Sequence, residues 1–399
     1  MEHTKSSCID CGAAPVSHHS EYVMAASQVV LSPVYGLLDR MTHRIFSLVP
    51  TRRLEKYIPR LFRLAQKLRL GVIRDAYDEK NSYRTKVMWD EALARGFSMY
   101  EFRIFGQPVE LYYVVTPTRV IVFDGLPRPD GPYTDSLHWM DDKDIMRRKF
   151  QAAGLLVSRG GCARTKEQAL EIFNRIDKPC ITKPNLGSRS RHTYVHLETE
   201  EQFLKGFFSA KELSPWVVIE EELSGQVHRG TLVNGNLVAV MRREGPFVIG
   251  DGISTIEQLV HEENKNPARQ GPIFHTISFG EEMDVVLAGQ QLTSQSVLEK
   301  ERKVYVHPKV GRGSGGCTVD CTDETHPEIK DMLQNVARTL KDSLIGVDFI
   351  VADITKPLSE QSKSGIIECN SLPFIDIHHY PLYGKVRNVA GALWDAVLK

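Results

Sequence analysis

Two carboxylates and one amide near the C-terminus could bind a divalent cation. Asp348 lies in the apolar run Gly-Val-Asp-Phe-Ile-Val, and Glu368 and Asn370 lie in Ile-Ile-Glu-Cys-Asn. Side chains alternate along a strand, so Glu368 and Asn370 should share one face while Cys369 points to the other. If the two strands pair as a hairpin, Asp348 joins that face. Such oxygen ligands suit Mg²⁺, although a solvated strand face with incidental acids would show the same pattern.

Two lysines that precede this region could hold phosphate groups. Lys183 ends an apolar strand, and the loop behind it contains Gly187, Arg189 and Arg191. Backbone amides and cationic side chains in such a loop can bind phosphate oxygens. The loop lacks the glycine spacing of a Walker loop or a dinucleotide fingerprint. Lys143 lies at the start of a predicted helix, and for each lysine taken alone a solvated surface position is the more common explanation.

A third pattern could contact the base and ribose of a nucleotide. The apolar strand Val-Val-Ile runs into Glu220, Glu221 and Glu222. Backbone groups and a carboxylate at such a strand end can face an adenine amino group and a ribose. Runs of acids at strand ends are also ordinary, so this pattern alone does not identify a nucleotide site.

Helices and strands in mixed order must position these residues, which indicates an α+β protein. The Gly- and Pro-rich stretch 125–132 is the clearest boundary. Apolar periodicity predicts helices at 59–70, 82–95, 141–153, 165–175, 199–209 and 327–343, and another from 254 or 255 with Glu257 in a capping interaction. Apolar or alternating runs predict strands at 100–105, 109–116, 119–123, 179–183, 193–197, 216–220, 231–242, 347–353 and 365–370.

The order of these features resembles the ATP-grasp superfamily, above all its amide-forming carboxylate–amine ligases. The ATP-grasp parts of cyanophycin synthetase and of bifunctional glutathione synthetase are the most similar, over about residues 138–399. The most specific stretches are Arg242 to Ile256, Thr325-His326-Pro327-Glu328, His378 to Pro381 and Arg387 to Ala390. The resemblance implies an ATP-grasp fold at 137–399, in which two α+β subdomains hold ATP and 155–215 form a lid. A mixed α/β region at 1–136 would supply a modified substrate-binding domain.

The resemblance also implies roles for single residues. Lys143 and Lys183 would hold the ATP phosphates, and Arg229 and Arg243 would face phosphate or a substrate carboxylate. The adenine contacts would be Glu220 and the backbone of Glu221 and Glu222. The ligands of two Mg²⁺ ions, which Mn²⁺ could replace, would be Asp348, Glu368 and Asn370.

These roles imply an ATP-dependent ligase that joins a small carboxylic acid to an amine, such as an amino acid or short peptide. Phosphoryl transfer would convert the acid to an acyl phosphate, with Lys183 and Arg243 in the catalytic roles. The amine would then displace phosphate and form an amide bond. The segment from 372 to 388 would line the acceptor pocket, with substrate contacts from Arg243, His378, His379 and Arg387. The two histidines could equally pack as structural residues.

Two departures from the family pattern support an alternative function. The phosphate loop has Ser190 and His192 where the family has more glycine, and Val227 stands where an acid usually binds ribose. A nucleotide-binding regulatory or scaffold protein without turnover would fit these changes. A ligase for a carrier-bound or peptide substrate is a narrower alternative.

Charge and cysteine content bear on partners and location. The chain has 50 basic and 50 acidic residues, so bulk charge gives no reason to expect nucleic acid. Seven cysteines among 399 residues are too sparse for a secreted disulfide scaffold. The N-terminus has no apolar signal segment, and no stretch is apolar enough to span a membrane. We expect a cytoplasmic protein and leave a homo-oligomer open.

Two N-terminal features remain undecided from the sequence. Cys8 and Cys11, with His18 or His19, could bind zinc, but no second ligand pair follows at the usual spacing. The basic segment 52–69 could contact an anionic membrane or a partner, or could be a solvated helix face.

Overall fold

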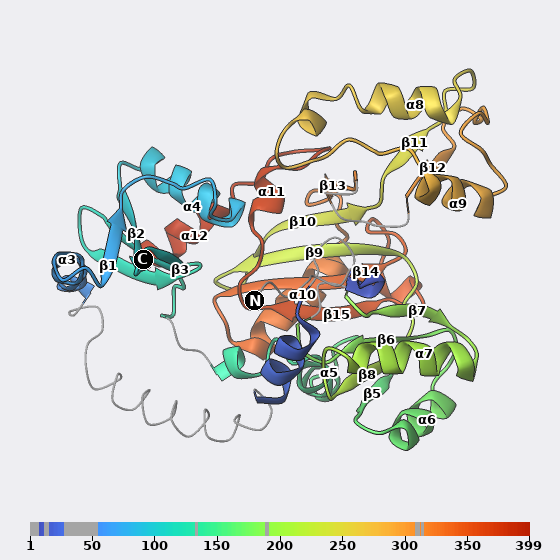
Figure 1. Ribbon diagram of the computed structural model, residues 1–399, viewed down its shortest axis with the longest axis horizontal. Helices are drawn as coiled ribbons and strands as arrows, with labels where there is room; N and C mark the ends of the chain where they lie inside the picture. The colour runs from blue at the N-terminus through green and yellow to red at the C-terminus, as the bar shows by residue number, and fades with distance from the viewer. Residues whose placement is uncertain are drawn as a thin grey trace, which may run out of the picture.

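The computed structural model describes residues 8–11, 16–27, 55–131, 135–187, 191–307, 312 and 315–399. A central sheet lies in the middle of the molecule, and three smaller lobes surround it (Figure 1). We name them the N-terminal lobe (58–124), the lower lobe (160–221) and the upper lobe (247–305). Arg189 and Ser190 of the predicted phosphate loop lie outside the described residues, as do Arg52 and Arg53 of the basic segment.

The central sheet carries the strands that were predicted to hold the metal ligands. Its order is β13 (Cys317–Asp320), β10 (Asn236–Glu244), β9 (Gln226–Val233), β14 (Leu344–Val351) and β15 (Gly365–Asn370), with all neighbours antiparallel. Helices α10 (Pro327–Leu340) and α5 (Lys143–Ala152) contribute to the core on one face. In α10 the buried residues include Ile329, Leu333, Val336 and Leu340, an apolar stripe at helical spacing. The opposite face carries Arg229 and Asp348, and its apolar residues Val233, Ala239 and Leu344 join the core that contains the last helix of the chain.

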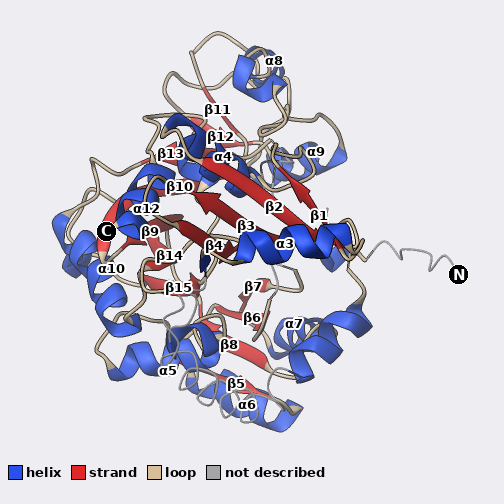
Figure 2. Ribbon diagram, turned by 90° about the vertical axis from the view of Figure 1, so that its left-hand side faces the viewer, coloured by secondary structure: helices blue, strands red, loops and turns tan. Residues whose placement is uncertain are grey.

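The lower lobe is an antiparallel sheet backed by two helices. Its order is β5 (Gly160–Ala163), β8 (Val217–Glu221), β6 (Cys180–Pro184) and β7 (Tyr194–Leu197). Helices α6 (Lys166–Arg175) and α7 (Glu200–Lys211) each begin at a threonine capping box and pack on this sheet (Figure 2). The lobe overlaps the range 155–215 that the resemblance assigns to a lid, and that assignment stays a prediction.

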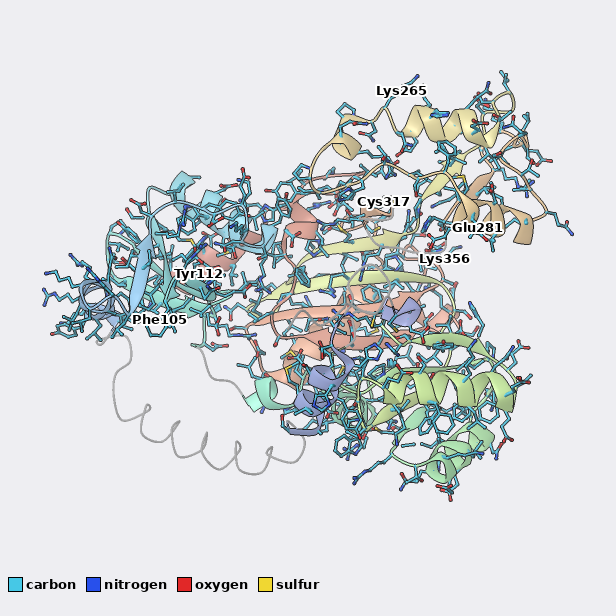
Figure 3. The ribbon with its side chains drawn as sticks, in the orientation of Figure 1. Phe105, Tyr112, Lys265, Glu281, Cys317 and Lys356 are labelled. Atoms are coloured by element: carbon cyan, nitrogen blue, oxygen red, sulfur yellow. The ribbon has the colours of Figure 1, made fainter. Side chains whose placement is uncertain are left out.

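The N-terminal lobe contains the sheet β1 (Gly71–Arg74), β2 (Ser98–Ile104), β3 (Gln107–Val115) and β4 (Val120–Asp124), with α3 (Ile58–Lys67) and α4 (Tyr83–Ala94). Tyr112 lies inside this lobe, whereas Phe105 lies at the exposed β2–β3 turn (Figure 3). The last helix, α12 (Val389–Leu398), packs into the same core. The indole N–H of Trp394 donates to the Met88 carbonyl over 3.2 Å. The boundary at residue 136 stays a prediction, because the core of this lobe includes a segment from the other end of the chain.

The upper lobe is built around the short antiparallel pair β11 (Phe247–Ile249) and β12 (Lys303–Tyr305), with α8 (Ile256–Glu263), α9 (Glu281–Gly289) and the turn η3 (Pro267–Gln270). The Asp251 carboxylate accepts the backbone N–H groups of Ile253 and Ser254 at 2.8 and 2.7 Å. These bonds, led by those from Ser254, lower the pKa of Asp251 to about 2. Asp251 therefore fixes the turn in the family-like stretch before α8.

Short elements complete the described chain. They are η1 (Ile9–Cys11), a helix at 18–27, η2 (Asp135–His138), η5 (Leu358–Glu360) and α11 (Asp376–His379). Within the described ranges, none of the helices combines the length and apolar character that crossing a membrane requires.

The structure confirms most predicted elements and corrects two details. The range 231–242, predicted as one strand, contains the end of β9 and most of β10. A turn at Asn234 and Gly235 joins these two strands. Both residues have positive φ, at 49° and 75°, as an Asn-Gly hairpin turn requires. The residue that completes the capping box with Thr255 is Gln258, one position after the predicted Glu257. Among the described elements, no sequence pattern had predicted β1, β5, β11, β12, β13, α9, α11, α12, the helix at 18–27 or the 3-10 turns, most of which are short.

Candidate active site

Strand pairing brings the predicted metal ligands together on one face of the central sheet. Asp348 lies directly opposite Glu368 across β14 and β15, and Asn370 lies opposite Gly346. On the other side of β14, Arg229 of β9 is paired with Asp348, and its guanidinium forms a two-point ion pair with the carboxylate. Cys369 is buried in the core on the opposite face, as predicted.

The two carboxylates are close enough to influence each other's protonation. Burial would raise the pKa of Asp348, but Arg229 holds it below its usual value. Burial and the negative charge of Asp348 raise the pKa of Glu368. Ionisation of one carboxyl group therefore disfavours ionisation of its neighbour, as is usual when two acids share a site.

This donor set fits Mg²⁺. Asp348 and Glu368 offer carboxylate oxygens, and Asn370 adds an amide whose Nδ2 is buried without a hydrogen-bond partner among the described residues. Mg²⁺ is usually held by one or two carboxylates together with substrate phosphates. A divalent cation would also relieve the repulsion that raises the Glu368 pKa.

Lys143 of α5 contacts the predicted phosphate loop and lies close to β15 at the edge of this face. It is the first residue of α5, whose N-cap is Asp142. Its Nζ donates to the Gly187 carbonyl over 2.9 Å and lies 3.9 Å from Glu368 Oε2. Burial lowers the pKa of Lys143, and Glu368 opposes that effect. A buried cation thus lies between the predicted phosphate loop and the predicted metal ligands.

Lys183 pairs with Glu220 inside the lower lobe. The Lys183 Nζ lies 2.7 Å from Glu220 Oε2, and both side chains are buried. Lys183 on β6 and Glu220 on β8 lie two positions apart in the strand register, which places them on the same face.

Glu221 and Glu222 are not brought to the lysines. The Glu221 carboxylate lies 2.7 Å from Arg159, and the Glu222 carboxylate accepts the His196 backbone N–H over 2.7 Å. Their own backbone N–H groups donate to the carbonyls of Arg159 and Pro179. The side chains and backbone N–H groups of Glu221 and Glu222 are therefore already bonded, and only their backbone carbonyls are left as candidate contacts for adenine.

Arg243 lies beside the acids and has no partner in the part of the chain that the structure describes. It shares a sheet face with Arg229, because Met241 and Arg229 are paired and Arg243 is two residues further on. Within the described residues, it forms no salt bridge and no side-chain hydrogen bond. Burial lowers its pKa, while Asp348 and Glu368 oppose this effect. Such an arginine can accept an anionic ligand without breaking an existing ion pair.

The C-terminal residues divide into two groups. His378 Nε2 lies 2.8 Å from Thr231 Oγ1 on β9, and burial lowers the pKa of this ring to about 3, with Arg229 adding to the effect. His378 is therefore a neutral ring on the site face.

His379 and Arg387 are occupied elsewhere. His379 Nε2 accepts the Ala390 backbone N–H over 3.0 Å at the start of α12. Arg387 binds Asp320 at 2.6 Å and Asp323 at 3.0 Å, and these bonds raise its pKa. Contact of either residue with a substrate stays a prediction.

Sequence reasoning missed Arg312. Its guanidinium lies 3.1 Å from the Asp376 carboxylate, and each group keeps one buried atom without a hydrogen-bond partner among the described residues. Arg312 is also close enough to lower the pKa of Arg243. The signal was the glycine-rich stretch Gly-Arg-Gly-Ser-Gly-Gly at 311–316.

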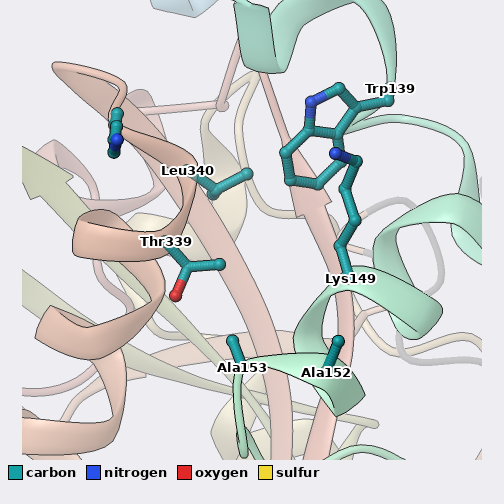
Figure 4. Close-up of a pocket in the computed structure, with 7 residues that line it drawn as sticks. Trp139, Lys149, Ala152, Ala153, Thr339 and Leu340 are labelled. Atoms are coloured by element: carbon teal, nitrogen blue, oxygen red, sulfur yellow. The ribbon is translucent and has the colours of Figure 1, made fainter.

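A hollow of about 570 Å³ lies apart from these residues, between α5 and the end of α10. Figure 4 shows Trp139 and Lys149 side by side in its wall, and the Lys149 Nζ lies 4.6 Å from the centre of the Trp139 ring. Its lining includes none of the predicted site residues. The candidate site is therefore the polar face of the central sheet with the adjoining lysines.

The chain is similar in sequence to large synthetases. It is 32% identical over 260 residues to cyanophycin synthetase from Synechocystis sp., a match that covers 64% of this chain and 30% of that protein. It is 34% identical over 183 residues to a bifunctional glutathione biosynthesis protein from Clostridium perfringens, which covers 45% of this chain and 23% of that protein. The chain thus matches less than a third of each relative's length. No protein-family model matches it.

The fold is shared with a solved glutathione synthetase. The crystal structure of the bifunctional glutathione synthetase from Pasteurella multocida superimposes with a TM-score of 0.62 and 21% identity, covering 80% of this chain and 43% of that one. Related sequence and a common fold agree with the ordered motifs. The chain is thus related in sequence to the cyanophycin and bifunctional glutathione synthetases and has the α+β ATP-grasp fold.

Proposed function

We propose that the chain is an ATP-dependent carboxylate–amine ligase that forms an amide bond of the peptide type. The observation that carries this proposal is the grouping of two buried lysines, a metal-ligand set and Arg243, which forms no ion pair within the described ranges. The names of the relatives are those of synthetic enzymes, which favours turnover over a purely regulatory role. The substrates would be a small carboxylic acid and an amine, such as an amino acid or short peptide.

In the first step, a carboxylate oxygen attacks the γ-phosphorus of ATP, the bond to the β–γ bridging oxygen breaks, and ADP leaves. Both reactants are anions, so the barrier depends on nearby positive charge. Lys143 and Lys183 would hold the phosphates. Bound Mg²⁺, held by Asp348, Glu368 and Asn370, would supply further charge neutralisation. The proposal includes two ions, replaceable by Mn²⁺, as the resemblance to the ATP-grasp ligases implies.

In the second step, the amine nitrogen attacks the acyl carbon, the bond between that carbon and the phosphate oxygen breaks, and phosphate leaves and takes up the proton that the amine loses. The oxyanion that forms on the acyl oxygen needs a positioned donor. Arg243 can serve because no acid among the described residues pairs with it, and it could equally hold the substrate carboxylate. Arg229 would keep Asp348 ionised and in place. His378, with its depressed pKa, suits a neutral contact better than a proton acceptor for an amine.

Nucleotide binding would use the space between the lower lobe and the central sheet. Glu220, and the backbone carbonyls of Glu221 and Glu222, are proposed as the contacts of adenine and ribose. The ion pair between Lys183 and Glu220 would loosen when a phosphate group takes the lysine. For His379 and Arg387, the existing bonds to Ala390, Asp320 and Asp323 support positioning roles in the acceptor segment.

The test is a phosphate-release screen in which carboxylic acids are crossed with amines in the presence of ATP and Mg²⁺. We expect release that requires one acid and one amine together. Lys143→Met should reduce it at least 100-fold, whereas Lys149→Met, on the same helix but against Trp139, should keep it. ATP binding without release across the whole panel would contradict the proposal and favour the scaffold alternative.

A further inference from the structure

A second cluster of potential metal ligands lies outside the candidate active site. It joins Cys8, Cys11 and His18 of the N-terminal segment to His192, which comes just before β7 of the lower lobe. One donor atom from each residue lies within 4.8 Å of the other three. Cys11 and His192 are buried, and Cys8 and His18 are partly buried. The sequence shows no second pair of zinc ligands at the usual spacing from Cys8 and Cys11. The fourth ligand, His192, lies 181 residues after Cys11 and is brought to it only by the fold.

The spacing of the donor atoms suits a tetrahedral zinc ion. The Cys11 Sγ lies 3.2 Å from His18 Nε2 and 3.4 Å from His192 Nε2, and the Cys8 Sγ lies 3.6 Å from His192 Nε2. In a tetrahedral site with Zn–S of about 2.3 Å and Zn–N of about 2.0 Å, a sulfur and a nitrogen are about 3.5 Å apart. Small movements of these side chains would admit the ion at the centre of the group.

The outer nitrogen of each histidine is already held by an acceptor. His192 Nδ1 lies 2.8 Å from the Ser209 carbonyl, and His18 Nδ1 lies 3.0 Å from Glu212 Oε2. An acceptor at Nδ1 keeps the proton there, which leaves the Nε2 lone pair free to face the sulfur atoms. Zinc-binding histidines usually have this kind of second contact, with a backbone carbonyl or a carboxylate.

Neighbouring contacts hold the two segments together. The Asp10 carboxylate, between the cysteines, accepts hydrogen bonds from Tyr194 at 3.0 Å and Ser209 at 2.6 Å. The His192 backbone N–H donates to the Asp10 carbonyl over 3.1 Å. His19, the alternative ligand considered from the sequence, is exposed and is not part of the cluster.

We propose that Cys8, Cys11, His18 and His192 bind one Zn²⁺ ion in a closed structural site. Two thiolates and two neutral imidazoles would balance the charge of the ion, and four protein ligands leave no open position for catalysis. The ion would fasten the N-terminal segment to the lower lobe, at the residue that follows the predicted phosphate loop. The zinc site itself does not depend on the proposed ligase activity.

Metal analysis of the purified full-length chain tests this proposal. We expect close to one zinc per chain, and Co²⁺ in its place should give the visible absorption of a tetrahedral site with sulfur ligands. Cys11→Ser and His192→Ala should each lose the metal and the Co²⁺ spectrum. Cys8→Ser, at the more exposed edge of the cluster, provides a second variant if substitution of the buried residues prevents folding.

Two matched controls make the result specific. His19→Ala removes a histidine adjacent in sequence to His18, and Cys162→Ser removes a free cysteine far from the cluster. Both variants should keep the metal and the Co²⁺ spectrum. A native chain that purifies without zinc and shows no tetrahedral Co²⁺ spectrum would overturn the proposal. Equal metal loss in His18→Ala and His19→Ala would do the same.

Discussion

At the scale of single residues, local periodicity explains what the sequence could predict. Glu368 and Asn370 are two positions apart on one strand, so their common face followed from strand geometry alone. Asp348 joined them once β14 and β15 were found to pair. The partner of Lys183 could not be predicted in the same way, because Glu220 belongs to a strand whose pairing with β6 is set by the whole lobe.

The adjacent pair Arg242 and Arg243 gives a sharp test at this scale. Arg243 has no partner among the described residues. Arg242 and Glu244 lie on the opposite face of β10 from Arg243 and form an ion pair with each other. Arg243→Ala should therefore reduce kcat/KM by about 100- to 1,000-fold, the usual loss when a donor to a developing oxyanion is removed. The melting temperature should change little, because no acid loses its partner.

Arg242→Ala is the matched control, measured in the same steady-state assay with the acid and amine that the screen identifies. It should affect stability more than turnover, since it removes one of the contacts of the buried Glu244. If Arg242→Ala and Arg243→Ala reduced kcat/KM equally, the role proposed for Arg243 would be wrong.

At the scale of elements, strand β9 carries chemistry on one face and a buried histidine on the other. His228 points away from Arg229, stacks on Phe349 with 5.3 Å between ring centroids, and donates from Nδ1 to the Gln226 carbonyl over 2.8 Å. Burial lowers its pKa to about 4. The sequence reading gave this histidine no role, since nothing local distinguishes a buried ring from a ligand.

The depressed pKa of His228 predicts a pH dependence of stability. The unfolded chain binds a proton at this position below about pH 6.5, and the folded chain binds it only near pH 4. The free energy of unfolding should therefore fall as the pH drops from 6.5 to 4, by up to about 3 kcal/mol from this residue. Urea unfolding at several pH values measures the slope. His228→Phe, which keeps the ring on Phe349, should reduce the slope but not abolish it, because the pKa of the buried His378 is depressed as well. An unchanged slope would show that His228 does not contribute.

At the scale of the whole molecule, the two ends of the chain lie where local patterns could not place them. The sequence predicted strands β2, β3 and β4 well, because each alternates between turn residues. It did not predict α12, whose apolar residues complete the core of the N-terminal lobe. It also left the zinc question open, since His192 is distant along the chain. In both cases the missing information was a long-range contact.

The packing of α12 predicts that the N-terminal lobe and the central sheet unfold together. Trp394 is fully buried, with Phe123 and Phe97 about 6 Å from its ring. Trp394→Ala should destabilise the chain by about 3 to 5 kcal/mol through loss of packing and the cavity that remains. Leu93→Ala, at an exposed position on α4, should have little effect. Chemical denaturation followed by circular dichroism and tryptophan fluorescence measures both, and two separate transitions in the native chain would contradict the shared core.

The zinc site and the nucleotide site should be coupled through one short loop. The segment from Lys183 to His192 begins at a proposed phosphate ligand and ends at a proposed zinc ligand, and the Gly187 carbonyl within it accepts a hydrogen bond from Lys143. If zinc fixes one end of this loop, its removal adds an ordering cost to ATP binding, because the loop must then be ordered by the nucleotide. We expect the Kd for ATP to rise at least several-fold in Cys8→Ser, and in the native chain treated with a zinc-selective chelator in excess Mg²⁺. Isothermal titration calorimetry measures this change, with Cys162→Ser as the control. A zinc-free chain that binds ATP as tightly as the zinc-bound chain would show that the metal fastens the N-terminal segment without acting on the loop.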